Sequence, residues 1–156
     1  MTQNELKTIF VYRDGKLFWR DRPMDEAGSV RRVKNSQYKQ IRYKQKNYLI
    51  HRLIYLYHYG FLPKIVDHIN RDSVDNRIEN LRAATYGSNN QNAKAKCNTS
   101  GFKNVHWNKN KNKWRVLLNV NGKSKFFGYY EDVELADLVA TEARNKYHGR
   151  FACHAV

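Results

Sequence analysis

Two short turns constrain the fold of this chain more than any other feature. Asp14-Gly15 stands between the runs FVYR and KLFW, and Asn121-Gly122 stands between KWRVLLNV and KSKFFGYY. Asp-Gly and Asn-Gly favour the positive φ angles of a two-residue type I′ turn, and aromatic and β-branched runs favour strands. The sequence therefore predicts two tight hairpins, one toward each end of the chain.

Further strands are predicted in both halves of the chain. Residues 38–43 and 48–50 form a second predicted hairpin across the polar segment KQKN. The N-terminal residues 4–12 are either a short helix or the start of a strand, because the pattern there is too short to decide. Residues 102–130 predict three antiparallel strands around Asn121-Gly122.

Two segments have apolar residues at helical spacing. Residues 50–59 end at Gly60 and predict a short buried helix, on which we expect His51 and His58 to pack or to form structural hydrogen bonds. Residues 133–148 predict a helix that packs on one face of the three-stranded sheet. Leu135, Leu138, Val139, Glu142 and Tyr147 lie on this helix. Its stripe consists of i,i+4 neighbours, either Leu135, Val139 and Ala143 or Leu138 and Glu142.

The central stretch from Ile65 to Asn92 brings His, Asp and repeated Asn together. It predicts a short strand at 65–69, a polar turn region at 70–79, an extended piece at 80–85 and a helix at 86–94 with Ser88 as its N-cap. Asn side chains often bond to their local main chain in loops. That loop-forming role is our interpretation of Asn70, Asn76 and Asn92.

Charge is distributed unevenly along the 156 residues, whose net charge is +15. Residues 1–60 hold 13 Lys and Arg against 5 Asp and Glu, and residues 94–156 hold 12 against 5, so their net charges are +8 and +7. Residues 61–93 hold 4 of each and are neutral. Basic flanks favour a polyanionic partner, and a centre with local acids is typical of a cation site within a basic frame.

Cysteine usage and hydropathy indicate the compartment. The two cysteines, Cys97 and Cys153, form no CxxC pair, so we expect free thiols in a reducing compartment and no zinc knuckle. No apolar run approaches the roughly 18 to 20 residues of a membrane span, and the polar start MTQNELK does not resemble a signal peptide. We expect a protein of the cytoplasm, including that of a host cell, without a membrane partner.

The central text VDHINRDSVDNRIENLRAAT followed by SNNQN resembles the motif of HNH endonucleases, in the form found in phage and intron-encoded homing endonucleases. The matching positions are the pair Asp67-His68, the triplet Asn80-Leu81-Arg82 and Asn89. Asn80 lies twelve positions after His68, and Asn89 lies nine positions after Asn80. The third letter of the motif is therefore Asn. The resemblance implies a ββα-metal fold over residues 61–94.

This resemblance also implies roles for the matching side chains. His68 would be the general base, since imidazole exchanges protons near neutral pH, and Asn80 would help to fix its geometry. Asp67 and Asn89 would bind one divalent cation, and their oxygens suit Mg²⁺, with Mn²⁺ as an alternative, better than Zn²⁺. Asp67 and His68 act together only if the strand ends or bulges there, because neighbours in a regular strand point to opposite faces. Arg82 is expected to contact phosphate.

The flanks carry further resemblances. The start GF, the runs VHW, KWR and FFGYY and a terminal HG lie within residues 101–150. This text is similar to an AP2 DNA-binding domain, which implies a three-stranded antiparallel sheet on DNA and a helix behind it. Residues 10–60 resemble, more loosely, the region that precedes the motif in the same endonucleases. They lie within an expected strand-rich module at residues 1–60, and residues 95–100 are the expected linker. Trp114 is expected in the core under the helix. The DNA-contacting positions implied or expected are Lys39, Arg42, Trp107, Lys113, Arg115 and Lys125, with His106 and Lys123 after them.

Together these expectations describe an α+β protein with three small modules. It would be a monomeric, divalent-metal-dependent endonuclease that nicks double-stranded DNA. Two alternatives remain open. One is a non-catalytic AP2-type DNA-binding regulator with a vestigial HNH fold, and the other is a structural nucleic-acid protein whose Asn-rich centre is a scaffold of loops. Metal-dependent DNA cleavage would distinguish the endonuclease from both non-catalytic alternatives.

Overall fold

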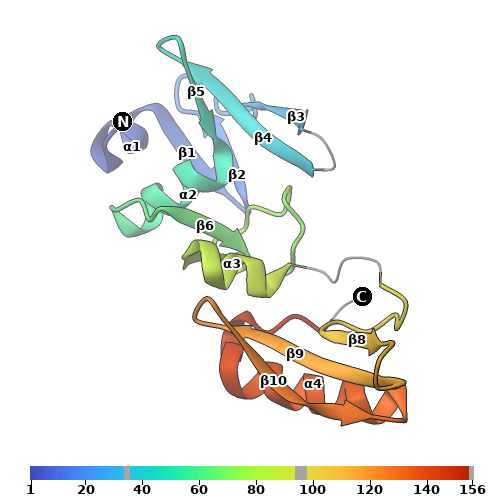
Figure 1. Cartoon of the computed structure of the whole chain (residues 1–156). Coiled ribbons are helices and arrows are strands. Elements are labelled where there is room, and N and C mark those ends of the chain that lie inside the picture. The colour runs from blue at the N-terminus through green and yellow to red at the C-terminus, as the bar shows by residue number, and fades with distance from the viewer. Residues whose placement is uncertain (34–35, 94–97, 155–156) are drawn as a thin grey trace. The chain divides into compact units, whose positions relative to one another are not determined.

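The computed structural model describes residues 1–33, 36–93 and 98–154, and the chain divides into two compact units, Met1–Thr85 and Tyr86–Val156. Both units combine helices with small antiparallel sheets, so the predicted α+β class is confirmed (Figure 1). Part of the predicted linker, residues 95–97 with Cys97, lies outside the described residues. Within the described ranges, no helix is long and apolar enough to cross a membrane.

The first unit contains three small antiparallel sheets, with strand orders β1-β2, β3-β4-β5 and β6-β7. In chain order its elements are α1 (Gln3–Ile9), β1 (Phe10–Arg13), β2 (Lys16–Trp19), β3 (Ser29–Val33), β4 (Ser36–Tyr43), β5 (Lys46–Leu49), α2 (Ile50–Tyr59), β6 (Ile65–His68), the 3₁₀ helix η1 (Ile78–Asn80) and β7 (Leu81–Ala84).

Local sequence rules account for most of these elements. Asp14 and Gly15 both have positive φ angles and close the predicted β1–β2 hairpin. The N-terminal segment forms both of its alternatives, because α1 ends at Ile9 and β1 begins at Phe10. The strand β3 was not predicted, since SVRRV between two loops is too short to be distinguished from an irregular segment.

One hydrophobic core joins the N-terminal strands to the central stretch. Leu6, Phe10, Leu17 and Ile54 are completely buried, and Val66 of β6 and Leu81 of β7 belong to the same cluster. Because burial of apolar surface is the main source of stability, β6 and β7 depend on residues far earlier in the chain. The predicted modules 1–60 and 61–94 share this core, and their boundaries stay predictions.

The second unit is a sheet of order β10-β9-β8 with a long helix packed on it. Its elements are α3 (Tyr86–Asn92), β8 (Val105–Asn108), β9 (Lys113–Val120), β10 (Lys123–Tyr130), α4 (Val133–His148) and the 3₁₀ helix η2 (Gly149–Phe151). The helix α3 begins two residues before Ser88, so the predicted N-cap at Ser88 is wrong. The Asn121-Gly122 turn joins β9 to β10 as predicted.

The helix α4 packs on the sheet through small side chains. Ala136 and Ala140 are completely buried against Val105 and Val116, and Trp114 packs at the edge of this cluster as expected. Leu135 and Leu138 are 49% and 64% exposed, so their predicted place in the packed stripe is wrong. Alanines let the helix approach the sheet closely, whereas the leucines lie on neighbouring positions of the helix that face away from it.

Gly15 offers a test of how the first hairpin supports the central loop. A Cβ atom on Gly15 would lie 2.8 Å from the backbone nitrogen of Arg77, and the φ angle is +76°. Gly122 has φ +79°, but a Cβ there would meet nothing within 4 Å. We therefore expect Gly122→Ala to cost about 1–2 kcal/mol from backbone strain alone. Gly15→Ala should cost about 1–3 kcal/mol more, because of the steric overlap.

The measurement is urea unfolding of each variant, followed by amide hydrogen exchange of buried strand residues in the unit that carries the change. Gly122→Ala is the matched control for the glycine conformation itself. Equal losses of stability in the two variants would contradict the close packing of the β1–β2 turn against Arg77.

Candidate functional site

Asp67 and His68 lie at the end of β6 and are both 7% exposed. The strand pairs with β7 in regular antiparallel register, with Asp67 opposite Arg82 and His68 opposite Leu81. The condition for the pair to act together was that the strand ends or bulges, and β6 ends at His68. The imidazole therefore lies where the chain leaves the sheet and enters the loop of residues 69–77.

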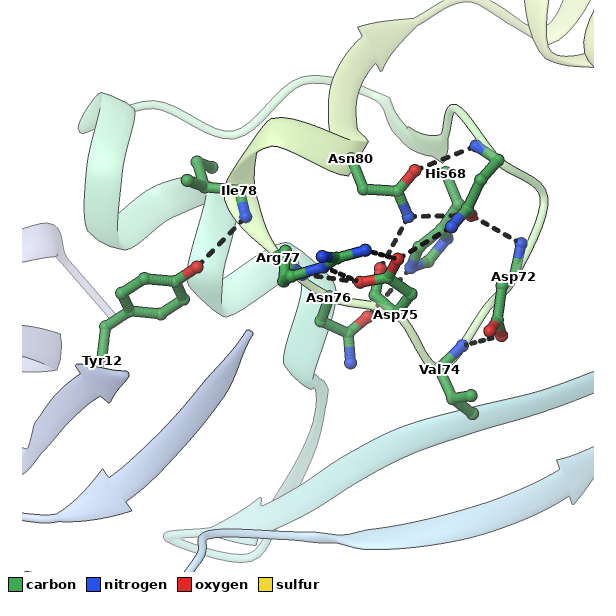
Figure 2. Close-up of polar contacts among 10 residues, drawn as sticks. Tyr12, His68, Asp72, Val74, Asp75, Asn76, Arg77, Ile78 and Asn80 are labelled. Carbon is green, nitrogen blue, oxygen red and sulfur yellow. Dashed lines mark hydrogen bonds and ion pairs between the residues drawn. The ribbon is translucent and has the colours of Figure 1, made fainter. Parts of the chain in front are cut away.

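Asn80 holds this loop closed. Its Oδ1 accepts a hydrogen bond from the backbone nitrogen of Asn70 at 2.9 Å, and its Nδ2 donates to Asn70 Oδ1 at 2.9 Å and to the carbonyl oxygen of Asp75 at 2.8 Å (Figure 2). The backbone of Asn80 also accepts from the nitrogen of Ile69 at 2.9 Å. Asn80 thus fixes the backbone of the loop that follows His68. The expected catalytic role of Asn80 stays a prediction.

Asp75 and Arg77 stabilise the far side of the same loop. Arg77 donates from Nε and Nη2 to the Asp75 carboxylate at 2.9 and 2.8 Å. This side-chain hydrogen bonding lowers the pKa of Asp75 to about 2, so the carboxylate is charged at physiological pH. Tyr12 of β1 accepts a hydrogen bond at its hydroxyl from the backbone nitrogen of Ile78 at 3.1 Å, which ties the loop to the first hairpin (Figure 2).

The imidazole of His68 is in contact with two side chains that the sequence reasoning assigned elsewhere. His68 Nε2 lies 2.9 Å from Asn76 Oδ1, and the ring of His51 meets the ring of His68 edge-on with centroids 5.0 Å apart. His51 was expected to pack, and it is 6% exposed. Burial, followed by the neighbouring His68 and Arg52, lowers the pKa of His51 to about 3, so His51 is neutral at physiological pH.

Asn76 is the residue that sequence reasoning missed. Its interpretation as a loop former is incomplete, because the side chain is 2% exposed and points to His68 rather than to water. Its Nδ2 is buried and has no hydrogen-bond partner among the described residues. A buried unsatisfied donor costs about 1–3 kcal/mol. The only signal in the sequence is the text DNR, eight residues after His68, which does not by itself distinguish a loop residue from a site residue.

Arg82 is bound to Asp67 across the β6–β7 pair. Its Nε and Nη2 each lie 2.8 Å from Asp67 Oδ2, and both side chains are less than a tenth exposed. Two charge-assisted hydrogen bonds to the same oxygen restrict the orientation of the carboxylate. The structure thus places Arg82 beside the predicted metal ligand, and its contact with phosphate stays a prediction.

The donor types fit a hard divalent cation, while the complete ligand set is not assembled within one unit. Asp67 supplies carboxylate oxygen, a donor that Mg²⁺ prefers. Asn89 lies in α3 of the second unit, so its partnership with Asp67 stays a prediction. In the described part of the chain, no three His, Cys, Asp or Glu side chains are grouped so that they could hold a metal. The expected set of one carboxylate and one amide does not require such a group.

The basic candidates of the first unit lie on β4. Lys39 forms an ion pair with Glu26, and it lines a surface pocket together with Gly15 and Asn76. Arg42 is exposed on the same strand, opposite Asn47 of β5. Lys39 is therefore the candidate that borders the central loop.

The basic and aromatic candidates of the second unit are divided between the two faces of its sheet. His106, Arg115 and Tyr129 are paired across the three strands and share the face opposite α4. Arg115 Nε is buried without a hydrogen-bond partner among the residues described. Lys113 is paired with the exposed Glu131 at 3.1 Å.

Two other candidates lie toward the helix. Lys125 is opposite the buried Leu118, and its Nζ donates to the hydroxyl of Tyr147 on α4 at 2.7 Å. Trp107 is 40% exposed and stacks edge-on against Trp114, with ring centroids 4.9 Å apart. The strand register therefore separates Lys125 and Trp107 from Arg115, and the roles of all three in DNA binding stay predictions.

Comparison with known proteins agrees with the geometry of the central stretch. The sequence profile described as HNH endonuclease matches residues 48–91, which include α2, the β6–β7 pair and most of α3. Protein 3.8 of Escherichia phage T7 is 33% identical over 96 residues, which cover 60% of this chain and 78% of that protein. No solved structure matches the chain significantly. The chain therefore belongs to the same family as protein 3.8 of phage T7 and carries an HNH endonuclease domain at residues 48–91.

Proposed function

We propose that this protein is a metal-dependent endonuclease that hydrolyses phosphodiester bonds in double-stranded DNA. The observation that carries the proposal is the Asp67-His68 pair, which is buried at the end of β6 within the segment that matches HNH endonucleases. HNH nucleases act on DNA and generally require a divalent metal. A phage relative is consistent with a phage or mobile-element origin of the homing type.

His68 takes the proton from the attacking water in this proposal. Its imidazole is held by Asn76 at 2.9 Å and by the edge of His51, so the ring has a defined orientation. A general base needs such an orientation, because proton transfer requires a hydrogen bond to the nucleophile. Asn80 contributes by closing the loop that begins directly after His68.

Asp67 and Asn89 are the residues that would hold the cation, with Mg²⁺ favoured and Mn²⁺ as an alternative. When bound, such a cation would stabilise the negative charge that develops on the leaving oxygen. Arg82 orients the Asp67 carboxylate through its two hydrogen bonds at 2.8 Å. Arg82 is also our candidate for a contact with phosphate near the cut.

DNA binding is proposed to come from the two basic flanks. Their net charges of +8 and +7 surround a neutral centre, so phosphate contacts have a source on either side of the HNH segment. In the first flank the contacts would be Lys39 and Arg42. In the second they would come from an AP2-like sheet through Trp107, Lys113, Arg115 and Lys125. A monomer carries one His68, so the proposed product is a nick in one strand.

A non-catalytic DNA-binding regulator is the second candidate function. The observation that favours it is the buried ion pair between Arg82 and Asp67, because a guanidinium already neutralises the carboxylate that would bind metal. The two functions differ in one measurable property. Only the endonuclease cleaves DNA when a divalent cation is supplied.

The first experiment is the cleavage of supercoiled plasmid DNA. We expect the parent to form the nicked product with Mg²⁺ or Mn²⁺ and to leave the plasmid intact with a chelator. His68→Ala should lower the rate by at least about 100-fold, since general bases contribute about 10²–10⁴-fold. His58→Ala is the control, because His58 is an exposed histidine on α2 whose ring packs against Tyr12 and has no proposed part in the chemistry. Equal rates for His68→Ala and the parent would exclude His68 as the base.

The second experiment measures the salt dependence of DNA affinity. Arg115→Ala should weaken binding and lower the slope of log K against log salt by about one unit, as expected for one lost phosphate contact. Lys146→Ala is the matched control, because it removes one exposed positive charge from α4 rather than from the open sheet face. If both variants change the slope equally, the sheet face is not the DNA-binding surface.

A further inference from the structure

Asn76 and His51 both contact the imidazole of His68, and neither belongs to the residues that the HNH resemblance assigned. We propose that Asn76 is a positioning residue for His68. In this inference its Oδ1 accepts the hydrogen of His68 Nε2 and so keeps the lone pair on Nδ1, the atom that takes the proton from water. The inference rests on the proposed function of His68 as the general base.

The chemistry of the contact selects one tautomer. An amide oxygen accepts hydrogen bonds and cannot donate them, so the 2.9 Å contact from Asn76 Oδ1 requires a hydrogen on His68 Nε2. A neutral imidazole has only one ring hydrogen, and its lone pair is then on Nδ1. The contact therefore favours the tautomer whose Nδ1 carries the lone pair and can accept a proton.

The burial of Asn76 supports a functional contact rather than a stabilising one. At 2% exposure the amide is shielded from water, which would otherwise compete for His68 Nε2. Asn76 Nδ2 is buried without a hydrogen-bond partner in the described residues. An amide that serves stability is normally satisfied at both ends. In Asn76 the oxygen end of the amide forms a hydrogen bond, and its partner is His68.

The residues on either side of Asn76 are anchored, so its amide has a fixed position. The carbonyl of Asp75 accepts from Asn80 Nδ2 at 2.8 Å, and the Asp75 carboxylate binds Arg77. Directly beyond Arg77, the nitrogen of Ile78 donates to the hydroxyl of Tyr12. These bonds hold the loop on both sides of the amide and direct it toward His68 (Figure 2).

His51 limits the ring from a second direction. Its edge contacts His68 at a centroid distance of 5.0 Å, and Tyr38 packs on His51 at 5.7 Å. Because His51 is buried and neutral, it supplies a wall without adding positive charge beside the base. One hydrogen bond and one ring contact together leave the imidazole little freedom to rotate.

Nitrogen NMR of the full chain, labelled with ¹⁵N-histidine at pH 8, measures the tautomer directly. The spectrum of His68→Ala identifies the His68 signals. We expect the parent to carry the hydrogen on Nε2, and Asn76→Asp to keep it there because a carboxylate is also an acceptor. Asn76→Ala should give a mixture of tautomers. Asn108→Ala is the matched control, since it removes an amide that accepts from the backbone nitrogen of Lys111 in the second unit, and it should leave the tautomer unchanged.

Single-turnover cleavage of a DNA substrate supplies the second measurement. Asn76→Ala should lower the cleavage rate by about 10- to 100-fold, by analogy with residues that orient metal-bound imidazoles, and leave the Kd for DNA unchanged. Asn76→Asp should recover part of this loss. An equal effect on Kd would indicate damage to the DNA-binding surface and would contradict a positioning role.

The two hypotheses fail in different ways. A parent with its hydrogen on Nδ1, or a folded Asn76→Ala with an unchanged tautomer, overturns the inference whatever the cleavage rate. Cleavage by His68→Ala at the parental rate overturns the proposed function and leaves the tautomer result intact. The parent spectrum requires no substitution at Asn76, so the inference can be refuted even if Asn76→Ala does not fold.

Discussion

The hydrogen bonds of Asn80 close the loop between β6 and β7, and the geometry of the candidate site depends on them. Apolar packing does not hold this loop, because Ile69 and Val74 are 44% and 37% exposed. The loop is instead held by the three bonds of the Asn80 side chain and by the ion pair of Asp75 with Arg77. A closed loop brings Asn76 back to His68, eight residues earlier in the chain, and gives the imidazole a fixed partner.

Local patterns in the sequence predicted what depends on neighbouring residues. The Asp14-Gly15 hairpin, the helix α2 and the end of β6 near His68 all follow from spacing and turn chemistry. The contact of Asn76 with His68 could not be predicted, because it depends on how a loop without periodicity closes. Periodicity also failed for α4: it groups Leu135 with Val139, but does not say which side of the helix meets the sheet.

The candidate site carries little net charge of its own. Asp67 is paired with Arg82 in a buried position, and His51 beside His68 is neutral. Breaking a buried ion pair leaves an uncompensated charge, so Asp67 and Arg82 stabilise each other. In the proposed function, most of the attraction for phosphate therefore comes from the basic flanks. The division of charge along the sequence has a structural counterpart here, since the segment that matches HNH endonucleases contains two ion pairs, Asp67 with Arg82 and Asp75 with Arg77.

The loop is supported from outside the segment that defines the family. Tyr12 binds the backbone of Ile78, and Gly15 packs against Arg77 so closely that no side chain fits between them. Both residues precede residue 48, where the match to HNH endonucleases begins. A fragment limited to the matched residues would keep every candidate catalytic side chain of β6 and lose the surface on which their loop rests. The transferable unit of this HNH domain therefore starts at α1, before the first hairpin, and evolution or design that moves it must carry α1 and the β1–β2 pair along.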